Sequence, residues 1–187
     1  INVFEDCQII LFLRKVKKVV FFDGDKKIFE VSKNTSEGVV ALYNNGKLES
    51  SWIFKIMDLP ISDELSKKLD QLSDTECPRK LKEAKATKLT FAAQVNGQNI
   101  IPVDKAVIYS YLPTKAQKGF CFLINGDFLT NAERTELMTN IWNEFLFEEI
   151  ARLQLEWFYE LRKTLYRFDV LKLLKGKYLY PSSGIEI

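Results

Sequence analysis

The first third of the chain alternates short apolar runs with turn-forming residues. Four segments have β-branched, aromatic or alternating apolar side chains: residues 19–22, 27–31, 39–43 and 51–57. Asn44, Asn45 and Gly46 favour a tight hairpin turn, because Asn and Gly tolerate positive φ angles. The pattern predicts an antiparallel meander over residues 19–57, with a loop over residues 32–38. A short helix with a basic end is predicted before it, over residues 8–13.

The middle of the chain mixes helix and strand signals. Ser62 precedes an acidic helical pattern and suits the N-cap of a helix that reaches about residue 73. The charged stretch 74–86 allows either a further helix or a mobile connector. Three later apolar segments predict strands: residues 87–95, 107–112 and 120–125. A polar loop is expected over residues 113–119.

From about residue 131 the apolar positions recur with helical spacing. They form one stripe: Trp142, Leu146, Ile150, Leu153, Trp157, Leu161 and Leu165. The spacing predicts a long helix to about residue 167, with Thr130 or Asn131 suited to cap its start. The order of elements predicts an α+β fold with a mostly antiparallel sheet, ending in a long helix. We expect a helix and meander over residues 1–60 and a mixed part over residues 61–187, or one continuous domain.

Composition removes several chemistries. The chain has 27 Lys and Arg against 25 Asp and Glu, a formal net charge of +2, and no histidine. Ser-His and Cys-His nucleophile pairs and an imidazole base are therefore excluded. The three cysteines lack a C-x-x-C spacing, so no metal site is expected. No apolar run reaches the roughly 20 residues of a membrane span, and we expect reduced thiols, a cytoplasmic location and no membrane contact.

Two basic clusters are candidate contact surfaces. The first contains Arg14, Lys15, Lys17 and Lys18, and the second contains Arg79, Lys80, Lys82, Lys85 and Lys88. A solvated surface is the favoured interpretation of both clusters. The second cluster also has no interleaved aromatic residues, which weakens the interpretation that it binds single strands. A protein- or nucleic-acid-interaction module that uses residues 76–88 and has no catalytic role stays open as an alternative, with nucleic acid the less favoured partner. The chain has no G-x-G-x-x-G motif and no P-loop motif.

The most distinctive stretch is residues 108–137, IYSYLPTKAQKGFCFLINGDFLTNAERTEL, with Trp142 and Asn143 soon after it. A helix that starts at Thr130 or Asn131 would offer positive potential and unpaired N–H groups. Arg134 would lie in its first turn, where a guanidinium is placed to meet an anion. On physical grounds alone, a well-capped helix start without a ligand is the favoured interpretation.

This stretch resembles the segment that follows the ATP-binding domain in sacsin-like proteins, which belong to the GHKL group with the ninety-kilodalton heat-shock chaperones. The opening QIILFLRKVKKVVF resembles the entry to the same region, so the resemblance covers about residues 5–160. It implies a transducer domain with the fold of the second domain of ribosomal protein S five. It also implies that Arg134, with Asn131 as its helix-start neighbour, contacts the γ-phosphate of ATP held by another domain.

The ATP pocket of that group uses a Glu and an Asn on one helix, a D-x-G-x-G turn and a glycine-rich lid, none of which is in this sequence. The resemblance therefore implies no cofactor within this chain, and ATP with Mg²⁺ in a parent ATPase. The start at Ile1 rather than Met leads us to expect a piece of a longer protein that is inactive alone. Its expected partners are the N-terminal ATP-binding domain of the same protein and a client protein. An independent enzyme using Lys, Tyr, Asp or Cys is the least favoured hypothesis.

Overall fold

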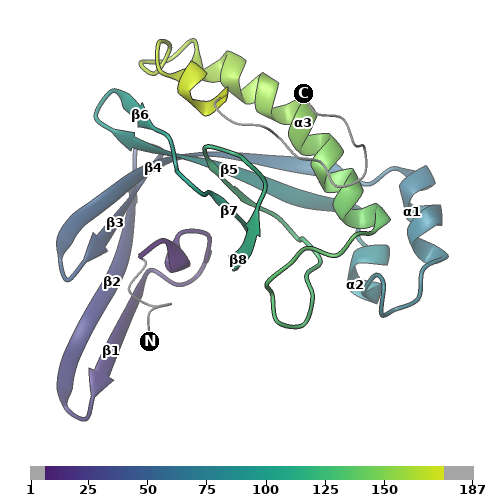
Figure 1. The fold of residues 1–187 in the computed structure, drawn as a ribbon, viewed down its shortest axis with the longest axis horizontal. Helices are drawn as coiled ribbons and strands as arrows, with labels where there is room; N and C mark the ends of the chain where they lie inside the picture. The colour runs from purple at the N-terminus through teal and green to yellow at the C-terminus, as the bar shows by residue number, and fades with distance from the viewer. Residues whose placement is uncertain (1–6, 175–187) are drawn as a thin grey trace.

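A computed structural model describes residues 7–174 of the 187-residue chain. Its centre is a nine-stranded sheet in the order β1-β2-β3-β4-β5-β9-β7-β8, with β6 paired to β5 (Figure 1). Neighbouring strands are antiparallel except β7 and β9, which are parallel. The predicted α+β class with a mostly antiparallel sheet is confirmed. The outer parts of the predicted divisions 1–60 and 61–187, residues 1–6 and 175–187, lie outside the described residues.

The first four strands form the predicted meander. They are β1 (Lys18–Asp23), β2 (Lys26–Ser36), β3 (Val39–Asn44) and β4 (Lys47–Pro60). The turn between β3 and β4 has φ 47° at Asn45 and 79° at Gly46, as the Asn-Gly pair predicts. The loop predicted over residues 32–38 is wrong at its start, because β2 pairs with β3 as far as Ser36.

The predicted helix over residues 8–13 is a single 3-10 turn, η2 (Cys7–Ile10). Lys33 explains why it goes no further. Its Nζ donates to the carbonyl oxygens of Ile10 at 2.8 Å, Leu11 at 3.1 Å and Leu13. The carbonyls of Leu11 and Leu13 are therefore bonded by a side chain of β2 and not by the N–H groups of a continuing helix. The Ile10 carbonyl accepts from Lys33 and from the N–H of Leu13 at 3.2 Å.

The second half supplies the helices and the remaining strands. They are α1 (Asp63–Asp70), α2 (Arg79–Lys82), β5 (Ala86–Asn96), β6 (Asn99–Ile101), β7 (Val107–Ser110), β8 (Leu112–Gln117), β9 (Leu123–Asn125), α3 (Ile141–Leu161) and η3 (Val170–Leu174). Ser62 caps α1 as predicted, because its Oγ accepts from the N–H of Leu65 at 3.2 Å. The polar loop predicted over residues 113–119 is wrong: most of it is β8, an edge strand paired with β7.

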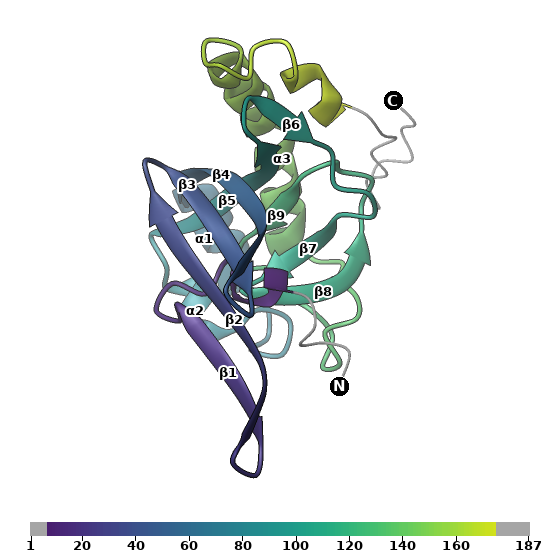
Figure 2. The ribbon, with the colours of Figure 1, turned by 90° about the vertical axis from the view of Figure 1, so that its left-hand side faces the viewer.

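Alternation along β4 and β5 separates two apolar cores on the two faces of the sheet. On one face, Leu89 and Phe91 of β5 pack against α3, and the Phe91 and Trp157 rings lie 5.5 Å apart. On the other face, Trp52 and Ala92 pack with residues of η2 and of the segment after it. Figures 1 and 2 show α3 and η2 on opposite sides of the sheet.

The helix start predicted at Thr130 or Asn131 is wrong, because α3 begins at Ile141. Asn140 is its N-cap, and the Asn140 Oδ1 accepts from the N–H of Asn143 at 2.8 Å. Residues 130–137 instead form a loop closed by a β-bridge between Thr130 and Leu137. Arg134 has φ 57°, a left-handed conformation that an α-helix excludes. The helix also ends at Leu161, several residues before the predicted end.

Candidate functional site

The loop at residues 130–137 holds both residues that the sequence proposed as a site. Asn131 shapes the loop: its Oδ1 accepts from the N–H groups of Thr135 at 2.9 Å and Glu136 at 3.3 Å. These bonds between a side chain and nearby backbone compete with helix formation. Asn131 therefore supports Arg134 by closing a turn, and the N–H of Arg134 donates to the Asn131 carbonyl at 3.0 Å.

Arg134 is half-buried and points toward the β7–β8 turn. Its Nη2 donates to the carbonyl of Ser110 at 2.7 Å. Its Nε is buried and has no hydrogen-bond partner in the described part of the chain. A guanidinium has five N–H donors, so Arg134 retains donors for a further acceptor.

The loop is fastened to α3 by Asn143, which is 2% exposed. Its Oδ1 accepts from the N–H of Leu129 at 2.9 Å, and its Nδ2 donates to the carbonyls of Leu129 and Met138, both at 2.7 Å. One side chain on the first turn of the helix therefore binds both ends of the loop.

Asp127 joins the loop region to the sheet. Its carboxylate accepts from the hydroxyl groups of Tyr111 and Thr87, each at 2.7 Å, and its carbonyl accepts from the Trp142 Nε1 at 2.8 Å. Burial, and then the bond to Asp127, raise the pKa of the Tyr111 phenol. Tyr111 is therefore held as a neutral donor next to a carboxylate.

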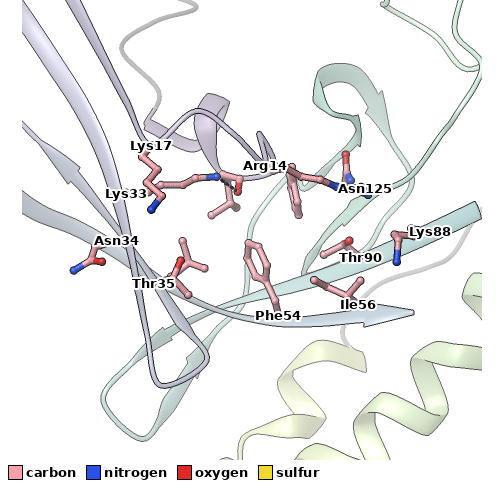
Figure 3. A pocket seen from close by; sticks show the side chains of 13 residues that line it. Arg14, Lys17, Lys33, Asn34, Thr35, Phe54, Ile56, Lys88, Thr90 and Asn125 are labelled. Atoms are coloured by element: carbon pink, nitrogen blue, oxygen red, sulfur yellow. Dashed lines mark hydrogen bonds between the residues drawn. The ribbon is translucent and has the colours of Figure 1, made fainter. Parts of the chain in front are cut away.

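A second candidate site, which we call the basic pocket, lies on the opposite face of the sheet from α3. It is a cavity of about 530 Å³ between the segment after η2 and strands β2 to β5 and β9 (Figure 3). It is lined by Leu11, Phe12, Arg14, Lys17, Lys33, Asn34, Thr35, Val40, Phe54, Ile56, Lys88, Thr90 and Asn125. Among these residues every charged side chain is a cation.

Two buried polar side chains stand side by side in the basic pocket. Thr90 of β5 and Asn125 of β9 are register partners, and they are 8% and 6% exposed. The Asn125 Oδ1 accepts from the N–H of Tyr111 at 2.7 Å, which turns its amide NH₂ away from that bond. Neither this NH₂ group nor the Thr90 hydroxyl has a hydrogen-bond partner within residues 7–174.

The cations of the basic pocket differ in how they are used. The Nζ of Lys33 donates hydrogen bonds to three backbone carbonyls. Burial lowers the pKa of the Lys33 ammonium. Lys88 pairs with Asp58. Arg14 lies 5.9 Å from the centre of the Tyr111 ring. In the described part of the chain neither Arg14 nor Lys17 forms a salt bridge, so these two charges are available to a ligand.

The second basic cluster is partly neutralised. Arg79 pairs with Glu83 at 2.7 Å, Lys82 pairs with Asp74 at 2.8 Å, and Lys88 pairs with Asp58. Lys80 and Lys85 are exposed. The first cluster places Arg14 and Lys17 on the basic pocket, whereas the neighbouring Lys15 is exposed and does not line it.

The three cysteines form no disulfide within residues 7–174. No group of three His, Cys, Asp or Glu side chains in that range is arranged to hold a metal ion. None of the described helices is long and apolar enough to cross a membrane.

Sequence reasoning missed Thr90 and Asn125. The available signal was a polar residue at an inward-facing position of an otherwise apolar strand, as in the run LTFAAQV. It missed the cap of α3 as well, although Asn140 directly precedes the first apolar residues of the helical stripe.

The structure therefore presents two candidate sites: the loop that holds Arg134, and the basic pocket on the other side of the sheet. In comparisons with known proteins, no family model, no curated protein and no solved structure matches the chain.

Proposed function

We propose that this chain is the transducer-like domain of a sacsin-like, cytoplasmic ATPase, and that it couples the ATP state of a preceding domain to conformational change. ATP and Mg²⁺ are held by that other domain in this proposal, and Arg134 is offered to the γ-phosphate. The observation that carries it is Arg134 itself, a half-buried guanidinium with a single described hydrogen bond and a buried Nε without one.

The anchoring of the loop supports a relay. The positive φ of Arg134 costs conformational energy and persists only because Asn131 and the bridge at Thr130 and Leu137 fix the turn. Asn143 ties both ends of this loop to α3. A phosphate that pulls on Arg134 would therefore shift the start of a 21-residue helix that packs on the sheet.

An always-charged guanidinium suits this task. Arg forks onto phosphate oxygens and stays protonated at any physiological pH. Such arginines stabilise the charge that develops on a transferring phosphoryl group. The single bond to Ser110 orients the group without neutralising its charge.

The test is ATP turnover in a longer protein that contains the preceding domain. We expect Arg134→Ala to lower kcat at least tenfold, in the direction that removal of such arginines produces, and Arg134→Lys to restore part of it. Arg162→Ala is the matched control, since Arg162 lies beyond the end of α3 against the ring of Tyr159. Unchanged turnover in Arg134→Ala, or substantial ATP hydrolysis by residues 1–187 alone, would contradict the proposal.

A further inference from the structure

We infer that the basic pocket binds a phosphate group joined to a flat apolar group, the chemistry of a nucleotide, either free or within a single strand. This inference is independent of the proposed coupling function, because the pocket and Arg134 are different sites.

The floor of the pocket supplies hydrogen-bond donors that the protein itself leaves unused. Thr90 and Asn125 are more than nine-tenths buried and face the cavity from paired strands. The N–H of Tyr111 can only donate, so the oxygen of the Asn125 amide must face it and the NH₂ group must face elsewhere. Both donors line the cavity, and a bound acceptor would pair with them.

The charges around these donors select an anion. Arg14 and Lys17 extend from the segment that covers the sheet, and Lys88 precedes Thr90 on the same face of β5. In Figure 3, Arg14 and Lys88 lie toward the Asn125 side of the cavity, and Lys17 and Lys33 lie toward the other side. Phosphate has more acceptor oxygens and more charge than a carboxylate, so it matches a site with several converging donors.

The apolar part of the lining selects what carries the phosphate. Phe54 and Ile56 point from β4 into the middle of the cavity (Figure 3). Phe54 is stacked on Phe12, with ring centres 5.6 Å apart and planes 20° apart, so its orientation is fixed. Ile56 is 59% exposed although it faces a cavity. A base gains by covering such groups, and stacking of bases on aromatic side chains is general in nucleotide binding.

Lys33 makes the cavity possible. By tying the carbonyls of Ile10, Leu11 and Leu13, it holds the covering segment above the sheet. Its positive charge adds to the field of the cavity, but its donors are engaged. Direct contacts therefore fall to Arg14, Lys17, Thr90 and Asn125.

The experiment follows the Asn125 side-chain amide by NMR in residues 1–187 during titration with four probes. These are inorganic phosphate, adenosine monophosphate, a single-stranded thymidine decamer and octanoate. We expect the nucleotide and the decamer to shift the amide resonances, and octanoate to bind at least tenfold more weakly. Equal affinity per site for the monophosphate and the decamer assigns a free nucleotide. Tighter, salt-dependent binding of the decamer assigns a single strand.

Variants locate the site. Thr90→Val removes a hydroxyl at constant shape, and Asn125→Asp keeps the acceptor for Tyr111 while replacing the donor by a carboxylate. In Asn125→Asp the backbone N–H of Tyr111 is followed in place of the missing side-chain amide. Each should weaken binding about tenfold or more. Lys17→Glu should do the same, whereas Lys15→Glu changes the net charge equally at a neighbouring position that does not line the cavity.

Three outcomes would overturn the inference. The first is that none of the phosphate-bearing probes shifts the Asn125 amide resonances. The second is that Lys15→Glu weakens binding as much as Lys17→Glu does. The third is that octanoate binds as tightly as the nucleotide. Far-ultraviolet circular dichroism establishes that each variant is folded. If Asn125→Asp fails to fold, Thr90→Val and the exposed Lys17→Glu decide the question.

Discussion

The side chain of Asn143 forms hydrogen bonds with both the N–H and the carbonyl of Leu129. The Leu129 N–H donates to the Asn143 Oδ1 at 2.9 Å, and the Asn143 Nδ2 donates to the Leu129 carbonyl at 2.7 Å. The Leu129 carbonyl also accepts from the N–H of Met138 at 2.9 Å. The same Asn143 Nδ2 also donates to the Met138 carbonyl at 2.7 Å, so it reinforces the closure of the loop at the bridge between Thr130 and Leu137.

Asn143 therefore acts as a clamp on the loop at residues 130–137. Asn143→Leu should lower the free energy of unfolding by about 1–3 kcal/mol, because the N–H of Leu129 and the carbonyl of Met138 lose the side chain that pairs them, whereas the Leu129 carbonyl keeps the N–H of Met138. Chemical denaturation measures the change. Gln98→Ala, at an exposed turn, is the control and should stay within about 0.5 kcal/mol of the parent. A loss below about 0.5 kcal/mol in Asn143→Leu would show that the clamp contributes little.

Gly126 lies against the core, not in a turn that needs a positive φ. A Cβ placed on it would lie 2.9 Å from the Cδ2 of Leu89, which is fully buried. Gly126→Ala should therefore destabilise the protein by about 1–3 kcal/mol through overpacking. Since Leu89→Val removes part of the obstructing side chain, the double variant should be more stable than the sum of the single effects predicts. Strict additivity in thermal or urea unfolding would argue against this contact.

The hydrogen bonds of Lys33 should stabilise mainly η2 and the segment that follows it. Lys33→Met keeps most of the aliphatic chain but removes the ammonium that donates to the carbonyls of Ile10, Leu11 and Leu13. The Ile10 carbonyl keeps the N–H of Leu13 as a donor. We expect a loss of about 1–3 kcal/mol in unfolding free energy. Faster hydrogen exchange should appear at the Leu11 and Leu13 amides, which donate to Gln8 and Ile10. Lys26→Met, at an exposed position of β2, is the control, and the same exchange rates in both variants would refute this role of Lys33.

Asp169 links the segment after α3 to the sheet and should give a pH-dependent contribution. Its bond to Lys172, and then the N–H of Ile100, hold the pKa of its carboxyl below the ordinary value of 3.8. A lowered folded-state pKa means that the stabilisation is complete above 3.8 and is lost as the pH falls through the folded-state value.

Asp169→Asn should therefore be less stable than the parent at pH 7, and the difference should disappear toward pH 2. Thermal unfolding across this pH range measures it. Glu133→Gln, which alters an exposed carboxylate of the Arg134 loop, controls for the change in net charge. A difference that does not depend on pH would indicate that shape, and not ionisation, matters at Asp169.

Several elements could be predicted from the sequence because residues close together in the chain determine them. The hairpin at Asn45 and Gly46 follows from residues that tolerate positive φ, and the Ser62 cap follows from one hydroxyl next to an N–H group. The apolar stripe from Trp142 to Leu161 gives a buried helical face wherever it packs. Neighbouring residues fix each of these features.

Other features were missed because partners distant in sequence decide them. The helix expected from residue 131 begins at Ile141 instead. The hydrogen bonds of Asn131 and Asn143 to the backbone stabilise a loop at residues 130–137, and such tertiary contacts override a weak local preference for helix. The segment predicted as a loop over residues 113–119 mostly forms β8, because it pairs with β7 at the edge of the sheet. The role of Arg134 stays a prediction.

The sequence by itself determined the α+β class, the meander, the turns and the apolar face of the last helix, since all of these depend on spacing along the chain. Only the tertiary structure decided that β9 lies between β5 and β7, and this placement brings Thr90 and Asn125 together beneath Arg14 and Lys17. Strand register and burial, which no local pattern encodes, turned two ordinary polar residues into the floor of a cationic cavity.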